Sequence, residues 1–332
     1  MKNMKERVTI YEVAKASGVS LATVSRVINK QGNVTEATRK KVEETVTRLG
    51  YKPSAVAQAL ATNRSTNIGV VIPAANYVYI SNMLNGITDA AKEKGYTLSL
   101  FVTQHQREDA IKVVEKVITS HVDGAIIFDD ELDVEDVNVL QSYAVPVIAV
   151  NNKIISDKVG CITFGYEHKI RLILNEYFEH GDKKMYFLHV HNCGRLLARI
   201  EKAFINCHIE ANKSYGLLSC DDSYNRTYQD FMDFFKTNKK GYFLAYRDSL
   251  AAAITNAAID SGLRVPEDVE VLSLIGTKYA SITRPQISAM HINMFDVGRK
   301  SMSMLDELLE EEHKGRSGKV ESTYVKRDTT TM

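Results

Sequence analysis

Apolar residues recur three and four residues apart in two short runs within residues 9–29, which predicts two amphipathic helices. Thr9 and Ser20 stand where each helix needs an N-cap, and Glu12 completes a capping-box pattern with Thr9. Gly18 lies between the runs, where a tight turn needs a residue without a side-chain clash. The pattern predicts a helix-turn-helix motif, which lays its second helix in the major groove of DNA.

A third helix is predicted from Thr35 to about Leu49, and Gly50 then provides a stop signal. Residues 52–60 form a short Ala-rich stretch that cannot hold a helix alone in water. We expect this stretch to order only against a partner, which is either its twin in a dimer or DNA itself.

The polar side of the second predicted helix carries candidate DNA contacts. Arg26 can donate a bidentate pair to guanine, and Leu21 or Ala22 can touch a thymine methyl group. Hydroxyl and amide side chains can bind phosphate oxygens, as a helix N-terminus does. The candidate phosphate contacts are Thr9, Tyr11, Ser20, Thr23, Ser25 and Asn29. A helical hairpin that only packs is the alternative for this window.

The remainder of the chain alternates β-branched strands with amphipathic helices. Such runs indicate buried parallel sheets with helices on both faces. The strands are expected at 68–72, 97–102, 124–128, 145–150, 185–189, 242–245 and 270–274. The helices are expected at 82–94, 108–121, 134–143, 169–178, 228–235, 249–261 and 297–311. The predicted fold class is an all-α head followed by an α/β body of two doubly wound lobes.

Charge is divided unevenly along the chain, although the formal total is only +1. Residues 1–60 hold eleven Lys and Arg against five Asp and Glu, which leaves the remaining residues net acidic. A positive head suits attraction to phosphate, whereas a chance fluctuation of surface charge would look the same without the motif. At 332 residues, the chain is long enough for more than one domain.

The sequence contains little evidence of an enzyme active site or of a metal site. The four cysteines form no CxxC pair, and His189 and His191 share a strand end without a third metal ligand. No nucleophile elbow, P-loop or HExxH pattern occurs, so we expect no enzyme, no cofactor and no metal. The N-terminus lacks the pattern of a signal peptide, and no run suits a membrane span. We therefore expect a cytoplasmic protein without a membrane partner.

The chain resembles the family of the lactose, purine and fructose repressors and the catabolite control proteins, the LacI family of bacterial transcription regulators. The segments TIYEVAKASGVSLATVSRVIN, NVTEATRKKVEETVTRLGYKPSAVAQAL and NIGVVIP carry the resemblance without a gap over residues 9–73. The resemblance implies base reading in the major groove by Leu21, Ala22 and Arg26. It also implies that Ala57 lies in the minor groove and that Leu60 wedges into it and kinks the duplex.

The same resemblance implies a body that is a periplasmic-binding-protein-like clamshell. Ligand would bind between the lobes, and hinge closure would change the spacing of two DNA heads in a homodimer. The expected domains are a head at 1–50, a hinge helix and linker at 51–62, and a body at 63–332. The expected lobes are the first at about 63–160 and 293–320, and the second at about 161–292 and 321–332.

The expected effector-cleft residues are Tyr79, Arg199, Arg247 and Asp248, and they depart from the family's pattern. Arg247-Asp248 replaces a common Asn-Asp pair, and Gly276 lies where a carboxylate would bridge sugar hydroxyls. A polyol site needs donors and acceptors facing each hydroxyl, so we expect neutral sugars to bind weakly or not at all. An anionic ligand, a protein co-effector and no effector stay open, as does a simple Arg247–Asp248 ion pair.

Two classes of function therefore stand. The first is a sequence-specific regulator of transcription, most simply a repressor, that binds double-stranded DNA as a homodimer on a near-palindromic operator. The second is a clamshell sensor or binding protein for small molecules whose DNA head is vestigial. Arg26, Leu60 and the basic head favour the first class.

Overall fold

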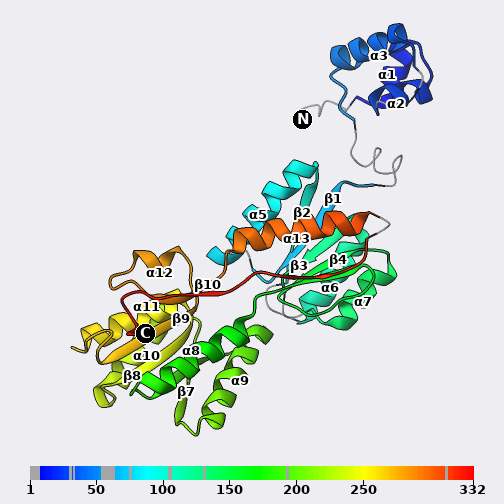
Figure 1. The fold of residues 1–332 in the computed structure, drawn as a ribbon. Helices are drawn as coiled ribbons and strands as arrows, with labels where there is room; N and C mark the ends of the chain where they lie inside the picture. The colour runs from blue at the N-terminus through cyan, green and yellow to red at the C-terminus, as the bar shows by residue number, and fades with distance from the viewer. Residues whose placement is uncertain are drawn as a thin grey trace. The chain divides into compact units, whose positions relative to one another are not determined.

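The structure, a computed structural model, describes residues 8–29, 32, 34–53, 64–74, 77–103, 107–129, 132–191, 194–310 and 313–332. The chain divides into two compact units, Met1–Thr66 and Asn67–Met332. Figure 1 shows the first as a small helical head and the second as an α/β body. The predicted minor-groove residues Ala57 and Leu60 lie outside the described residues.

The head consists of α1 (Ile10–Ser17), α2 (Leu21–Ile28) and α3 (Glu36–Leu49). The predicted capping box is confirmed, because Thr9 N donates to Glu12 Oε2 at 2.7 Å and Glu12 N donates to Thr9 Oγ1 at 3.4 Å. Gly18 ends α1 in the left-handed region with φ of 63°, which favours glycine. These local signals fix the start of α1 and the turn that follows it.

A small apolar core holds the three head helices together. Val13 of α1, Val24 and Val27 of α2 and Val42 of α3 are buried in it. This burial confirms the amphipathic pattern predicted for the helix-turn-helix, and it turns the other side of α2 outward.

The body contains two six-stranded sheets, one in each lobe. The first has the order β11 (Ser317–Lys319), β5 (Val159–Thr163), β4 (Val147–Val150), β3 (Gly124–Ile127), β1 (Asn67–Ile72) and β2 (Thr97–Val102). The second has the order β12 (Thr323–Val325), β10 (Ser288–His291), β9 (Val269–Ile275), β8 (Gly241–Arg247), β6 (Met185–Val190) and β7 (Tyr215–Cys220). All neighbouring strands are parallel except the antiparallel pair β10–β12.

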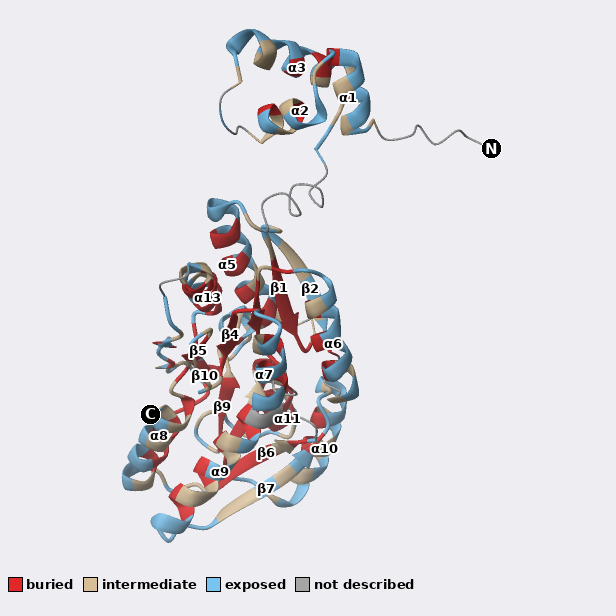
Figure 2. Cartoon of the chain, turned by 90° about the vertical axis from the view of Figure 1, so that its right-hand side faces the viewer, coloured by how far each residue is buried: buried red, intermediate tan, exposed pale blue. Residues whose placement is uncertain are grey.

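Helices cover these sheets, as the alternating pattern predicted. The helices of the first lobe are α5 (Val78–Lys94), α6 (Arg107–Thr119), α7 (Val134–Ser142) and α13 (Met294–Leu309). Those of the second are α8 (Tyr166–His180), α9 (Gly194–Glu210), α10 (Tyr224–Thr237), α11 (Asp248–Asp260) and α12 (Lys278–Ile282). Figure 2 shows the buried strands between helices whose outer sides are exposed.

The crossovers between lobes differ slightly from the expected boundaries. β5 pairs with β4 in the first sheet, so the chain enters the second lobe after Thr163 and not at residue 161. The chain returns after β10, because α13 packs along α5 of the first lobe. The C-terminal strands then separate, with β11 in the first sheet and β12 in the second.

The packing of α13 on α5 depends on two glycines. A Cβ atom at Gly86 would lie 2.0 Å from the carbonyl oxygen of Phe295, and one at Gly298 would lie 2.1 Å from that of Met83. Real atoms cannot approach so closely, so only glycine lets the two backbones touch here.

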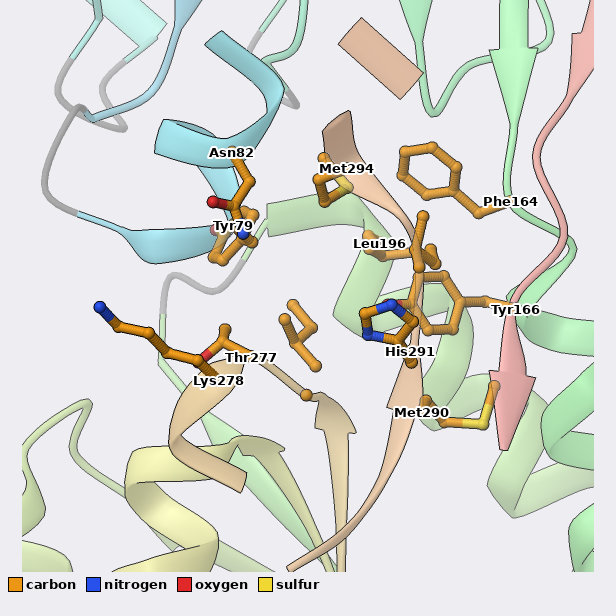
Figure 3. Close-up of a pocket in the computed structure, with 13 residues that line it drawn as sticks. Tyr79, Asn82, Phe164, Tyr166, Leu196, Thr277, Lys278, Met290, His291 and Met294 are labelled. Carbon is orange, nitrogen blue, oxygen red and sulfur yellow. The ribbon is translucent and has the colours of Figure 1, made fainter. Parts of the chain in front are cut away.

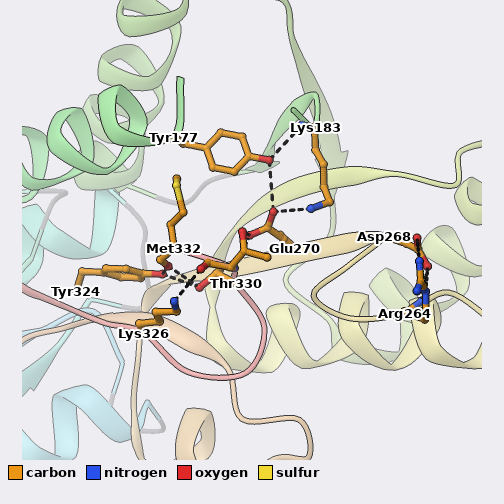
Figure 4. Close-up of polar contacts among 10 residues, drawn as sticks. Tyr177, Lys183, Arg264, Asp268, Glu270, Tyr324, Lys326, Thr330 and Met332 are labelled. Atoms are coloured by element: carbon orange, nitrogen blue, oxygen red, sulfur yellow. Dashed lines mark hydrogen bonds and ion pairs between the residues drawn. The ribbon is translucent and has the colours of Figure 1, made fainter. Parts of the chain in front are cut away.

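The C-terminal segment is tied to the second sheet by one buried carboxylate. Glu270 Oε1 accepts from Lys183 Nζ at 2.7 Å, as Figure 4 shows. Oε2 accepts from Thr331 N at 2.7 Å and from Thr331 Oγ1 at 2.9 Å. Burial, together with the neighbouring Glu270, raises the pKa of Tyr177 above its usual range. The cluster joins strand β9 to the end of the chain.

Candidate DNA interface and effector cleft

The exposed side of α2 presents the three predicted base-reading residues together. Leu21, at 38% exposure, opens the helix, and Ala22 and Arg26 are exposed on the same outward side. Val24 and Val27 point into the head core instead. Leucine, alanine and arginine side chains can all contact base edges in a groove. These three are exposed, so such contact would not require any of them to leave a partner in the protein interior.

The predicted phosphate contacts lie around the two helix starts, but several already serve as caps. Ser20 Oγ accepts from Thr23 N at 3.1 Å and lies 2.8 Å from Thr23 Oγ1. Asn29 ends α2 and donates from Nδ2 to Ser25 Oγ at 3.2 Å. Tyr11, at 70% exposure, extends from α1. Their contacts with phosphate remain predictions.

Of the four predicted effector-cleft residues, Tyr79, Arg247 and Asp248 lie near one another, because Tyr79 stacks on Tyr77 and Tyr77 contacts Arg247, whereas Arg199 lines a different cavity. Asp248 is buried and accepts from Thr277 N at 2.8 Å and from Thr277 Oγ1 at 2.6 Å. Its carboxylate therefore fastens the turn before α12, and the suggested Arg247–Asp248 ion pair is replaced by an ion pair of Arg247 with Asp222.

Arg199 and Tyr79 line different cavities. Arg199 Nε lies 3.2 Å from Glu167 Oε1, and its Nη2 donates to Asn151 Oδ1 at 3.3 Å. These residues border an open polar cavity of about 360 Å³ that also includes Lys153. Tyr79 instead lines a second cavity of about 80 Å³, which we call the apolar cavity.

The apolar cavity lies between the lobes, and aromatic and aliphatic side chains narrow it. Figure 3 shows Tyr79 on α5 facing the segments that connect the lobes. Its largest apolar lining residues are Tyr79, Phe164, Tyr166, Leu196, Met290 and Met294. Sites for small molecules usually measure about 300–1,000 Å³, so this space is small for a sugar.

Gly276 also lines the apolar cavity, and its surroundings exclude a side chain. A Cβ atom there would lie 2.5 Å from Ala289 Cβ and 3.0 Å from the carbonyl oxygen of Met290. Gly276 N also donates to that carbonyl oxygen at 2.8 Å. The Ala289 side chain and the Met290 carbonyl group of β10 therefore occupy the space that a side chain at this position would need.

Both parts of this architecture are similar to known protein families. Residues 9–54 match the family described as bacterial regulatory proteins, lacI family, and residues 230–330 match the periplasmic binding protein-like domain. The chain is 30% identical over 322 residues to the HTH-type transcriptional regulator pepR1 of Lactobacillus delbrueckii subsp. lactis, with 93% of each chain covered. The chain belongs to the lacI family.

A second relative and a solved structure are also similar over nearly the whole chain. The chain is 28% identical over 312 residues to catabolite control protein A of Priestia megaterium, which covers 92% of this chain and 93% of the relative. Its fold matches the crystal structure of the lac repressor dimer bound to operator and the anti-inducer ONPF, with a TM-score of 0.83 and 24% identity. That match covers 98% of this chain and 100% of the other.

Sequence reasoning missed two residues that contact Arg247 in the structure. Asp222 and Tyr77 contact Arg247, yet neither was among the predicted cleft residues. They lie far from Arg247 in sequence, and no local motif marks them.

No helix in the described parts of the chain is long and apolar enough to cross a membrane. Within those same parts, no group of three or more His, Cys, Asp or Glu residues could hold a metal ion.

Proposed function

We propose that this lacI-family member is a sequence-specific, DNA-binding regulator of transcription that represses by binding a near-palindromic operator as a homodimer. The observation that carries the proposal is the outward face of α2, where Leu21, Ala22 and Arg26 stand exposed on a helix fixed by buried valines. The basic composition of residues 1–60 adds attraction to phosphate. The relative pepR1 is itself a transcriptional regulator, and the lac repressor dimer was crystallised on its operator.

Exposed apolar side chains on both sheets support the homodimer. β2 is an end strand of the first sheet and exposes Leu100 at 48% and Val102 at 38%. β7 is an end strand of the second sheet and exposes Leu217 at 45%. Apolar residues on unpaired edge strands invite association, so we infer that a second copy of the chain covers these edges.

Selection of duplex DNA from a random pool tests the function directly. We expect the purified protein to enrich one near-palindromic sequence and to bind it in a saturable manner. Arg26→Ala should relax discrimination at one base pair of each half-site by about 1–3 kcal/mol. Arg48→Ala, an exposed cation on α3, is the matched control and should leave the selected sequence unchanged.

Equal affinity for all duplexes at physiological ionic strength would contradict the proposal and favour the second candidate, a clamshell binding protein with a vestigial head. The cleft chemistry gives a further expectation. Asp248 is committed to Thr277 and Gly276 has no room for a carboxylate, so unmodified monosaccharides should bind weakly or not at all. Tight binding of one of them in calorimetry would contradict this part.

A further inference from the structure

Three side chains join the two lobes of the body, and we call Tyr77, Asp222 and Arg247 the cross-lobe latch. Tyr77 precedes α5 in the first lobe, and its hydroxyl donates to Asp222 Oδ2 at 3.3 Å. Asp222 follows β7 and Arg247 ends β8, both in the second lobe. The Arg247 guanidinium lies 4.9 Å from the centre of the Tyr77 ring and forms an ion pair with Asp222.

Each member of the latch contacts the other two. Arg247 Nη2 also donates to the main-chain carbonyl oxygen of Asp222 at 3.2 Å, which fixes the guanidinium beneath the ring. The Arg247 side chain is only 17% exposed, and partial burial strengthens both the ion pair and the cation–π contact. Arg247, a candidate ligand contact, therefore uses Nη2 and the face of its guanidinium for contacts within the protein.

Aromatic rings continue the latch into the interior. Tyr77 stacks on Tyr79 with ring centres 5.5 Å apart and planes 13° from parallel. Tyr79 meets Phe128 edge to face at 6.3 Å, and Phe128 meets Phe164 at 6.4 Å. Burial, with a smaller contribution from Tyr246, raises the pKa of Tyr79 well above its usual value, so its phenol stays neutral. This aromatic row runs from the latch to Phe164, and Tyr79 and Phe164 both line the apolar cavity.

We propose that the cross-lobe latch holds the lobes together through the chain's own side chains, so that lobe closure needs no small-molecule effector. A ligand can shift two states only by its different affinity for them. Here, the contacts among the three latch residues exist only when the lobes meet. These contacts take the place of a ligand, because they stabilise the closed state and not the open one. The inference rests on the proposed function. We expect lobe closure to set the spacing of the two DNA heads in a homodimer, and the latch would let the chain set this spacing without a ligand.

A tryptophan reporter tests the latch in the full chain, which has no native Trp. Phe164→Trp places one indole beside the apolar cavity, and Tyr166→Trp serves as a second reporter if the first melts early. We expect acrylamide to quench the indole poorly in the latched protein. Adding Tyr77→Ala or Arg247→Ala should raise the quenching constant by about twofold or more, because the open state becomes populated.

Matched variants separate the latch from general loosening. Tyr77→Phe removes only the hydroxyl and should give a smaller rise than Tyr77→Ala. Tyr143→Ala removes a tyrosine of the first lobe that is 64% exposed, and it should change nothing. Equal quenching in the latch variants and in Tyr143→Ala would overturn the proposal. A fall in quenching when glucose is added to the reporter protein would overturn it as well, because it would show closure driven by a ligand.

Binding of the selected duplex is measured on the same samples. A protein that binds no duplex selectively, yet responds to Tyr77→Ala by increased quenching, refutes the proposed function and supports the latch. A protein that binds one duplex selectively, yet shows no increase in quenching with Tyr77→Ala, supports the proposed function and refutes the latch. The two proposals therefore fail separately.

Discussion

Replacing the buried carboxylate of Glu270 should lower the free energy of unfolding of the body by a large amount. Its carboxylate is 1% exposed and accepts four hydrogen bonds, one from Lys183, one from the Tyr177 hydroxyl and two from Thr331. Lys183 is itself only 7% exposed, so Glu270→Ala leaves an ammonium group buried without its counter-charge. Breaking such a pair costs about 3–5 kcal/mol in free energy of unfolding.

Graded variants separate charge from hydrogen bonding. Glu270→Gln keeps an acceptor for Thr331 and should cost less than Glu270→Ala, because the amide oxygen replaces one carboxylate oxygen. The double variant Lys183→Met with Glu270→Met removes both charges and should recover much of the loss, since a buried pair often gains little over apolar residues of similar volume. The two single Met variants complete a double-mutant cycle.

Urea unfolding of the full chain measures these effects, with the transition of the body followed by tyrosine fluorescence. The head is a separate compact unit, so its transition is identified from variants that alter only α1 or α3. We expect the urea midpoint of the body to fall for Glu270→Ala while the slope stays constant. A loss below about 1 kcal/mol, or a double variant as unstable as the worse single one, would refute the reasoning.

Two further changes probe other parts of the fold. Gly86→Ala forces a methyl group into the Phe295 carbonyl and should cost the first lobe about 1–3 kcal/mol, whereas exposed Thr88→Ala on the same helix should be nearly neutral in a thermal melt. Burial lowers the pKa of His208 from 6.5, although its hydrogen bond to Phe204 opposes this, so the neutral ring stabilises the fold. That stability is present above pH 6.5 and is lost as the pH falls below it, and the urea midpoint should become less sensitive to pH in His208→Phe.

Local signals explain why the head could be predicted well from sequence. Thr9 and Glu12 stand three residues apart, and the bonds that define the capping box form between those same residues. Most buried strands of the body were also visible as β-branched runs, but the buried strands β5 and β10 were not predicted. Helix α9 was missed although Leu197, Ile200 and Phe204 repeat at helical spacing, so its signal was present. Strand β7 gave a weaker signal because it is an end strand with alternating exposure.

The cleft could not be predicted in the same way, because its partners are distant in sequence. Arg247 was examined beside its neighbour Asp248, yet its partners are Asp222 and Tyr77, which the fold brings from another strand end and from the other lobe. Asp248 likewise turns to Thr277. Residue type alone predicted a departure from the family's sugar-binding pattern, but only the folded chain shows which residues contact Arg247 and Asp248.

The packing around Gly276 leaves no room for the carboxylate side chain that the family resemblance would place there. At Gly276 a Cβ atom would meet Ala289 at 2.5 Å, so Gly276→Asp must displace β10, which also carries the link between the lobes. We therefore expect Gly276→Asp to lower the melting temperature of the body without gaining affinity for monosaccharides in calorimetry. A stable Gly276→Asp protein that binds a sugar would show that the cleft needs only one carboxylate. It would also show that the packing of β10 against Gly276 imposes no constraint.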